Sequence, residues 1–141
     1  MTAAGPKVLI VDDEERFRTT MHKLLSVRGL DSHVAANGKE ALEELREHSY
    51  DVVILDVRMP EVSGMEVLPE IRKIDSFIEV IIMTGYASVA TAREIMKLGA
   101  YDFLLKPYSI VELLDKIEGA FDRRTARLRL AADRPETDSR E

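Results

Sequence analysis

The sequence predicts an α/β domain in which helices cover both faces of a doubly wound parallel sheet. Two observations lead to this prediction: short runs of Val, Ile and Leu without polar alternation, and intervening segments with helical spacing of apolar residues. An unbroken apolar run is typical of a strand that is buried on both faces, as in a parallel sheet. Strand and helix alternate five times, and right-handed crossovers of this kind place helices on both faces.

Each of the four strong strand candidates ends at a polar or charged residue, and a weaker strand is expected at residues 31–35. The strong runs are 8–11, followed by Asp12 and Asp13; 52–55, followed by Asp56; 80–83, followed by Thr84; and 103–105, followed by Lys106. In parallel sheets the binding crevice lies outside the carboxyl ends of the strands. We therefore expect three carboxylates, one hydroxyl and one ammonium group to converge on that edge and form a site.

Five segments between these runs have the apolar spacing of amphipathic helices. Turn residues separate the helices from the strands, as expected for short connections. The helical stripes lie at 17–25, 42–45, 67–74, 89–96 and 110–121, and the turns contain Gly29, Asn37-Gly38, Pro60, Gly64, Gly85, Gly99 and Pro107.

Composition and charge exclude several classes of protein. The 141 residues suffice for one hydrophobic core but not for two ordinary domains. A net charge of −6 argues against general nucleic-acid binding, and the lack of cysteine excludes disulfides and thiolate chemistry. The histidines His22, His33 and His48 have no metal-ligand spacing. With no signal-like or membrane-length apolar segment, we expect a cytoplasmic protein that does not enter the membrane.

The expected site has a chemistry that follows from its residue types. Asp12, Asp13 and Asp56 would repel one another, by about 1 kcal/mol per pair at 4 Å in water and by more at lower dielectric. Hard carboxylate oxygens without imidazole favour Mg²⁺, or Mn²⁺ in its place, as the counter-ion. A carboxylate beside such a metal can attack phosphorus and form an acyl phosphate. Lys106 and Thr84 would stabilise the charged oxygens of the transferred group.

Four sequence elements together resemble the receiver domain of two-component response regulators, the CheY-like superfamily. They are Asp12-Asp13, Asp56 within Leu-Asp-Val-Arg-Met-Pro, Thr84-Gly85 and Lys106-Pro107, in this order and spacing. The resemblance covers residues 7–121, which we take as the receiver domain, and leaves 122–141 as a helix extension and a charged tail. It implies a flavodoxin-like fold with five parallel strands in the order 2-1-3-4-5 and five helices.

The resemblance also implies roles for the acidic residues. Asp56 would be the phosphoacceptor, Asp13 a direct metal ligand, and Asp12 a second carboxylate or a ligand through water. The backbone carbonyl of Arg58 would complete the metal site. The side chains of Arg58 and Tyr86 would modulate access to it, although Tyr86 is equally consistent with an exposed loop aromatic.

Further implied roles concern binding and switching. Thr84 and Lys106 would bind the phosphoryl group, and the Lys106-Pro107 peptide bond would be cis, an isomer that proline makes accessible. Phe103 would be the aromatic switch that turns inward when Thr84 moves toward the phosphate. The fourth helix, fifth strand and fifth helix would then present a changed face.

The implied partners are proteins. The donor would be a sensor histidine kinase or a histidine phosphotransfer protein, docking at Glu15, Arg18, His22 and Pro107. The output would be a downstream protein or a covalently linked effector, with phosphorylation-dependent homodimerisation as an option. Direct nucleic-acid binding by this domain is not expected.

Each residue also has an ordinary structural interpretation. Asp12 and Asp13 could cap a helix, Asp56 could be a loop residue, and Thr84 could be another cap. Lys106 could be a solvated charge, and Phe103 on a strand could be simply core. The joint placement of the polar residues at adjacent strand ends favours the site over these alternatives.

The tail has three interpretations, because arginines recur there with leucines between them. The last helix could continue into solvent, begin a linker to an effector domain, or form a protein-binding extension. Nucleic-acid binding by the arginines alone would need a supporting surface. Residues 135–141 are polar and charged, and we expect disorder there. The arginines are Arg123, Arg124, Arg127, Arg129 and Arg134.

Three functions remain open from the sequence. The first is a stand-alone receiver and the second is the amino-terminal receiver of a longer transcription activator. Both are phosphoacceptors rather than enzymes, with only self-phosphorylation and autodephosphorylation chemistry. The third is a Mg²⁺-dependent aspartyl phosphohydrolase, whose nucleophile lies on the first strand in an Asp-x-Asp pattern. Here Asp12-Asp13-Glu14 lacks the second aspartate of that pattern.

Overall fold

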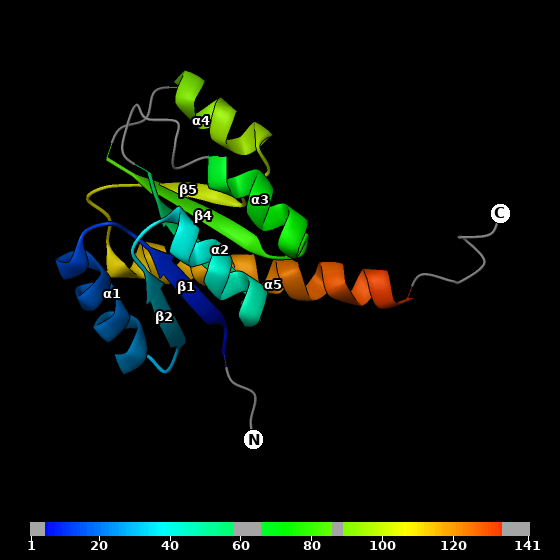
Figure 1. The fold of residues 1–141 in the computed structure, drawn as a ribbon, viewed down its shortest axis with the longest axis horizontal. Helices are drawn as coiled ribbons and strands as arrows, with labels where there is room; N and C mark the ends of the chain where they lie inside the picture. Colours follow the sequence, from blue (N-terminus) through cyan, green and yellow to red (C-terminus); the bar gives the residue numbers. More distant parts are fainter. Residues whose placement is uncertain (1–4, 58–65, 86–88, 134–141) are drawn as a thin grey trace.

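The computed structural model describes residues 5–57, 66–85 and 89–133 (Figure 1). Strands and helices alternate along this part of the chain, as predicted. The strands are β1 (Lys7–Val11), β2 (Asp31–Ala35), β3 (Val52–Asp56), β4 (Glu79–Thr84) and β5 (Asp102–Leu105); the helices are α1 (Glu15–Val27), α2 (Gly38–Glu47), α3 (Val67–Ile74), α4 (Val89–Lys97) and α5 (Ile110–Asp133).

The strands form one sheet in the order β2-β1-β3-β4-β5, and every neighbouring pair is parallel. This confirms the predicted fold class and the strand order that the resemblance implied. The ladders reach beyond the apolar runs, since Asp56 pairs with Met83 and Thr84 pairs with Leu105. Parallel pairing therefore holds these two polar residues inside the sheet rather than in the loops that follow.

Two hydrophobic clusters lie on opposite faces of the sheet, because successive side chains of a strand point to opposite sides. Leu9 and Val11 of β1 join the cluster beneath α2, α3 and α4. Val8 and Ile10 join the cluster beneath α1 and α5. Figure 1 shows the same division of the helices between the two faces. Because side chains on both faces of these strands are buried, successive residues are apolar, and the strands appear in the sequence as unbroken apolar runs.

The last helix, α5, is 24 residues long and continues past residue 121, where the resemblance to the receiver ends. In Figure 1 its final turns project beyond the sheet. Among the described helices, none combines the length and apolar character needed to cross a bilayer.

Gly119 allows α5 to pack closely against Tyr101, the residue before β5. A Cβ atom at position 119 would collide with the hydroxyl oxygen of Tyr101 and lie 3.3 Å from its Cζ atom. We expect Gly119→Ala to destabilise the domain by up to about 2 kcal/mol, because an overpacking cost of about 1–3 kcal/mol outweighs a gain of about 1 kcal/mol in helix propensity. Urea unfolding would measure the change in the free energy of unfolding.

The Tyr101→Phe background provides the matched control, because it removes the colliding oxygen and keeps the ring. In that background Gly119→Ala should cost less than in the wild-type chain. Equal costs in the two backgrounds would contradict the packing explanation.

Candidate functional site

The polar residues that follow or end the strands gather at the carboxyl edge of the sheet. Asp12 follows β1, Asp56 ends β3, Thr84 ends β4 and Lys106 follows β5. Backbone hydrogen bonds extend the sheet around them: the Asp12 N–H donates to Ala35 O at 3.2 Å, and the Lys106 N–H donates to Thr84 O at 2.8 Å. The backbone thus fixes each of these residues relative to its neighbour.

Three carboxylates form a cluster at this edge. Asp12, Asp13 and Asp56 each offer an oxygen within 4.8 Å of the other two. Asp12 is only 3% exposed, and its Oδ1 accepts a hydrogen bond of 2.8 Å from the Glu14 N–H. Its Oδ2 is buried and has no hydrogen-bond partner among the described residues. Such a buried oxygen is costly unless a donor or a cation reaches it.

The charge on Asp12 is correspondingly unfavourable. Burial raises the pKa of its carboxyl group to about 6, and the negative charge of Asp56 adds to this rise. The Glu14 N–H and the positive charge of Lys106 act in the opposite direction. The Glu14 N–H and Lys106 therefore offset only part of the rise in the pKa of Asp12.

Lys106 reaches the cluster from the end of β5. Its Nζ lies 2.8 Å from Asp56 Oδ1, and the Asp56 side chain is 7% exposed. The Lys106-Pro107 peptide bond is cis. The ammonium group also lies 4.8 Å from the centre of the Phe17 ring, a cation–π distance.

Phe17 and Tyr108 form an aromatic wall beside the site that the sequence analysis did not assign to it. Their rings meet edge to face, with centroids 6.4 Å apart. Burial raises the pKa of Tyr108 to about 12, with further contributions from the charges of Asp12 and Asp56. The sequence did not single out Phe17, because it also belongs to the apolar stripe expected for α1. For Tyr108, the only sequence signal of a place near the site was its position just after Lys106-Pro107.

The two residues of the expected switch lie on adjacent strands. Thr84 is 2% exposed at the end of β4. Phe103 on β5 pairs with Ile82 and is half-buried against the cluster beneath α2, α3 and α4. Both placements agree with an ordinary core position as well as with a switch.

The kinase-docking candidates on α1 border a groove between α1 and β2. Glu15, Arg18 and His22 line it. Arg18 Nη1 donates to Asp12 O at 2.8 Å, and His22 Nδ1 lies 2.7 Å from Ser32 Oγ. Two of these three candidates are therefore engaged within the chain, and Arg18 connects α1 to the backbone of Asp12.

Some expected site residues are not placed. Arg58 and Tyr86 lie outside the described residues, so their expected roles have no structural account. Pro107 is described, and it is exposed.

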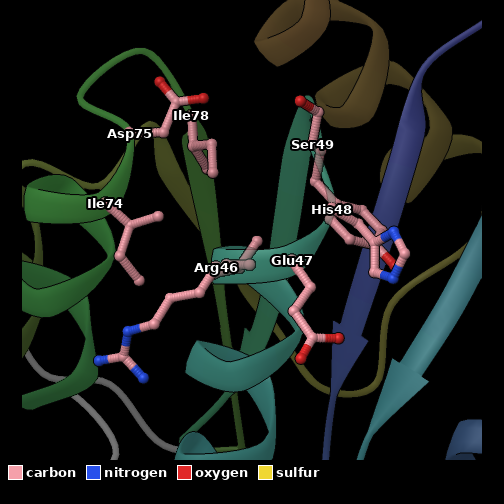
Figure 2. Close-up of a pocket in the computed structure, with 9 residues that line it drawn as sticks. Arg46, Glu47, His48, Ser49, Ile74, Asp75 and Ile78 are labelled. Carbon is pink, nitrogen blue, oxygen red and sulfur yellow. The ribbon is translucent and has the colours of Figure 1, made fainter.

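A second hollow lies at the opposite, amino edge of the sheet, and Figure 2 shows it. Its lining comes from the end of α2, the end of α3 and the loops that lead into β3 and β4, and it includes His48, Ser49 and Asp75. None of the carboxyl-edge residues belongs to it. The carboxyl edge is therefore the better candidate for phosphoryl chemistry.

Comparisons with known proteins agree with this geometry. The sequence model of the response regulator receiver domain family matches residues 8–118. The chain is 41% identical over 120 residues to the Transcriptional regulatory protein ZraR of Escherichia coli, covering 85% of this chain and 27% of ZraR. It is 36% identical over 112 residues to Sporulation initiation phosphotransferase F of Bacillus subtilis, covering 79% of this chain and 90% of that protein.

A solved structure shows the same likeness. The receiver domain of the Francisella response regulator 1452 superposes with a TM-score of 0.76 at 34% identity, covering 84% of this chain and 98% of that one. The chain spans about a quarter of the length of relatives such as ZraR. On the family match, the shared fold and these relatives, the chain belongs to the response regulator receiver domain family.

Proposed function

We propose that this receiver domain takes a phosphoryl group onto Asp56 from a sensor histidine kinase or a histidine phosphotransfer protein. One observation carries the proposal: the Asp56 carboxylate ends the central strand β3, beside two further carboxylates and 2.8 Å from Lys106 Nζ. An acidic cluster alone is common on protein surfaces. A buried carboxylate paired with lysine inside such a cluster is a much more specific arrangement.

The residues present fit a Mg²⁺ or Mn²⁺ ion. Asp12, Asp13 and Asp56 are hard oxygen donors, and the unpartnered Oδ2 of Asp12 supports a cation there. We include the backbone carbonyl of Arg58 as a further ligand on the basis of the family resemblance. When bound, the metal would neutralise charge on the transferring phosphoryl oxygens.

The chemical step is a nucleophilic displacement at phosphorus. A carboxylate oxygen of Asp56 forms a bond to phosphorus while the P–N bond to the donor histidine breaks, with the electron pair leaving on the imidazole nitrogen. Lys106 stabilises the charge of the group that arrives, and Thr84 donates a hydrogen bond to one of its oxygens. Self-phosphorylation by small acyl phosphates and slow autodephosphorylation would use the same groups.

The response to phosphorylation is a population shift. The phosphoryl group adds negative charge and acceptor oxygens to a small crevice, which favours the arrangement with Thr84 drawn toward it. Phe103 then fills the space behind Thr84, and the surface of α4, β5 and α5 changes. The half-buried position of Phe103 beside β4 is compatible with this role.

The relatives differ in how much chain they contain besides the receiver domain. ZraR is named a transcriptional regulatory protein, which favours a receiver covalently linked to an effector. The sporulation phosphotransferase, of which this chain covers 90%, favours a single-domain relay. An aspartyl phosphohydrolase is disfavoured, because the carboxylate paired with Lys106 lies on β3 rather than on β1.

The first test replaces the acceptor. Asp56→Asn keeps the size of the side chain but removes the nucleophilic carboxylate, so labelling by acetyl phosphate with Mg²⁺ should be abolished. Phosphotransfer from candidate histidine kinases should be lost in parallel. Mass spectrometry of the intact protein would follow both reactions.

Asp115→Asn is the matched control, because Asp115 is exposed on α5 and the chemical change is the same. Its labelling should equal that of the wild-type chain. Stable labelling of Asp56→Asn at another residue would refute the assignment.

The second test concerns the metal. Mg²⁺ should raise the thermal midpoint of the wild-type domain, by the equivalent of about 2.7 kcal/mol at one hundred times its dissociation constant. Asp13→Asn should shrink this shift. In metal-free buffer the same variant should unfold at a higher temperature than the wild type, because one of three clustered negative charges is gone.

Glu15→Gln serves as the control, since Glu15 is an exposed acid at the start of α1 outside the carboxylate cluster. Its response to Mg²⁺ should match the wild type. A wild-type midpoint that is insensitive to Mg²⁺ would exclude the proposed metal site.

A further inference from the structure

The extension of α5, defined here as residues 122–133, is tied to the amino edge of the sheet by arginines. Arg124 Nε lies 3.0 Å from Asp51 Oδ1, and its Nη1 lies 3.1 Å from Asp75 Oδ2. Only 11% of the Arg124 side chain is exposed. One guanidinium group thus joins α5 to the residue before β3 and to the loop before β4.

Two more arginines converge on a buried carboxylate. Glu79, the first residue of β4, is 0% exposed. Its Oε2 lies 2.9 Å from Arg127 Nη1 and 3.3 Å from Arg123 Nε. Arg127 Nη2 also donates to Ser76 O at 2.9 Å, in the loop before β4. Pairing at Oε2 offsets part of the cost of burying this carboxylate, while its Oε1 accepts no hydrogen bond from the described residues and lies 3.9 Å from Arg72 Nη2.

The same arginines stack on aromatic rings next to their ionic partners. The guanidinium carbon of Arg127 lies 5.1 Å from the centre of the Phe77 ring, and that of Arg123 lies 5.7 Å from the centre of the Tyr101 ring. Planar guanidinium groups are suited to combining ion pairs with stacking, and lysine does not reproduce this. The contacts are therefore specific to arginine.

These contacts together fix the direction in which α5 leaves the sheet. Positions 123, 124 and 127 lie on one side of the helix, because residues three and four apart are neighbours on a helical surface. Their partners belong to separate segments: Asp51 before β3, Asp75 and Ser76 in the loop before β4, and Glu79 in β4. Asp75 also borders the hollow of Figure 2, on the loop that follows α3. Attachment to several separate points resists rotation as well as displacement.

We propose that Arg123, Arg124 and Arg127 form an arginine clamp that makes the α5 extension a rigid arm of the domain. The clamp sets the direction in which the chain leaves the sheet, so that a segment joined to the arm keeps a defined orientation. This goes beyond the proposed phosphoacceptor function, because no residue of the clamp belongs to the carboxyl edge. It also commits these guanidinium groups to carboxylates within the chain, which leaves them poorly placed to bind nucleic-acid phosphates.

A distance measurement between two spin labels tests the clamp. The chain has no cysteine, so Val27→Cys and Leu130→Cys introduce a unique pair of attachment points. These side chains are 81% and 71% exposed, at the end of α1 and on the arm. Pulsed electron resonance should give a single narrow distance distribution in the otherwise unchanged chain.

Arg124→Gln combined with Arg127→Gln should broaden that distribution about two-fold or more, because the arm then frays and reorients locally. Arg129→Gln is the control for the chemical change: it makes the same substitution once, at an exposed position of the same helix, and should leave the width unchanged. The combined variant Arg124→Lys with Arg127→Lys keeps both charges and should still broaden the distribution, because the two-pronged contacts are lost.

A distribution that is already broad in the unchanged chain would overturn the proposal, as would an unchanged width in the combined glutamine variant. Circular dichroism reports whether that variant folds. If it does not, Arg124→Gln alone is judged by the same criterion, with an unchanged width again counting against the clamp. Neither measurement involves phosphorylation, so the result is independent of the proposed acceptor function.

Discussion

Parallel backbone pairing of β1, β3, β4 and β5 is the constraint on which the rest of the molecule depends. It brings the carboxyl ends of these strands to one edge of the sheet. The carboxylates at those ends repel one another, yet the sheet holds them close together. Asp12, Asp13 and Asp56 lie together because the ladders hold them there, not because they attract one another. The hydrophobic burial of the strands offsets this repulsion, which leaves a site that favours a cation.

The carboxylates at the two edges of the sheet have different ionic partners. At the amino edge, Glu79 meets arginines from α5, and Asp51 and Asp75 share Arg124. At the carboxyl edge, Lys106 pairs with Asp56 while the Oδ2 of Asp12 lacks a hydrogen-bond partner among the described residues. The first edge supplies several guanidinium groups to its carboxylates and suits a structural role, although Glu79 Oε1 likewise accepts no hydrogen bond from the described residues. The second edge brings one ammonium group to three carboxylates, which suits a site for an incoming cation.

The sequence predicted the fold and the aspartate cluster because both depend on local patterns. Unbroken apolar runs mark doubly buried strands, and a polar residue at the end of such a run has a position that the parallel sheet determines. Tyr108 and the partners of Arg124 depend instead on contacts between distant segments. The recurring arginines Arg123, Arg124 and Arg127 fitted a helix that continues into solvent as well as a linker or a protein-binding extension. Only the burial of Glu79 and the positions of Asp51 and Asp75 show that these arginines have partners within the chain.

The burial of β4 limits which kind of motion the proposed switch can use. All six residues of β4 are buried, and the strand is paired on both sides, with β3 and with β5. Displacing it would break two ladders and disturb both hydrophobic clusters, whereas turning a side chain at its end changes few contacts. Thr84 and Phe103 therefore suit a switch in which the strand stays fixed. Because Glu79 begins the same strand, a fixed β4 also keeps the arginine clamp in place while the carboxyl edge changes state.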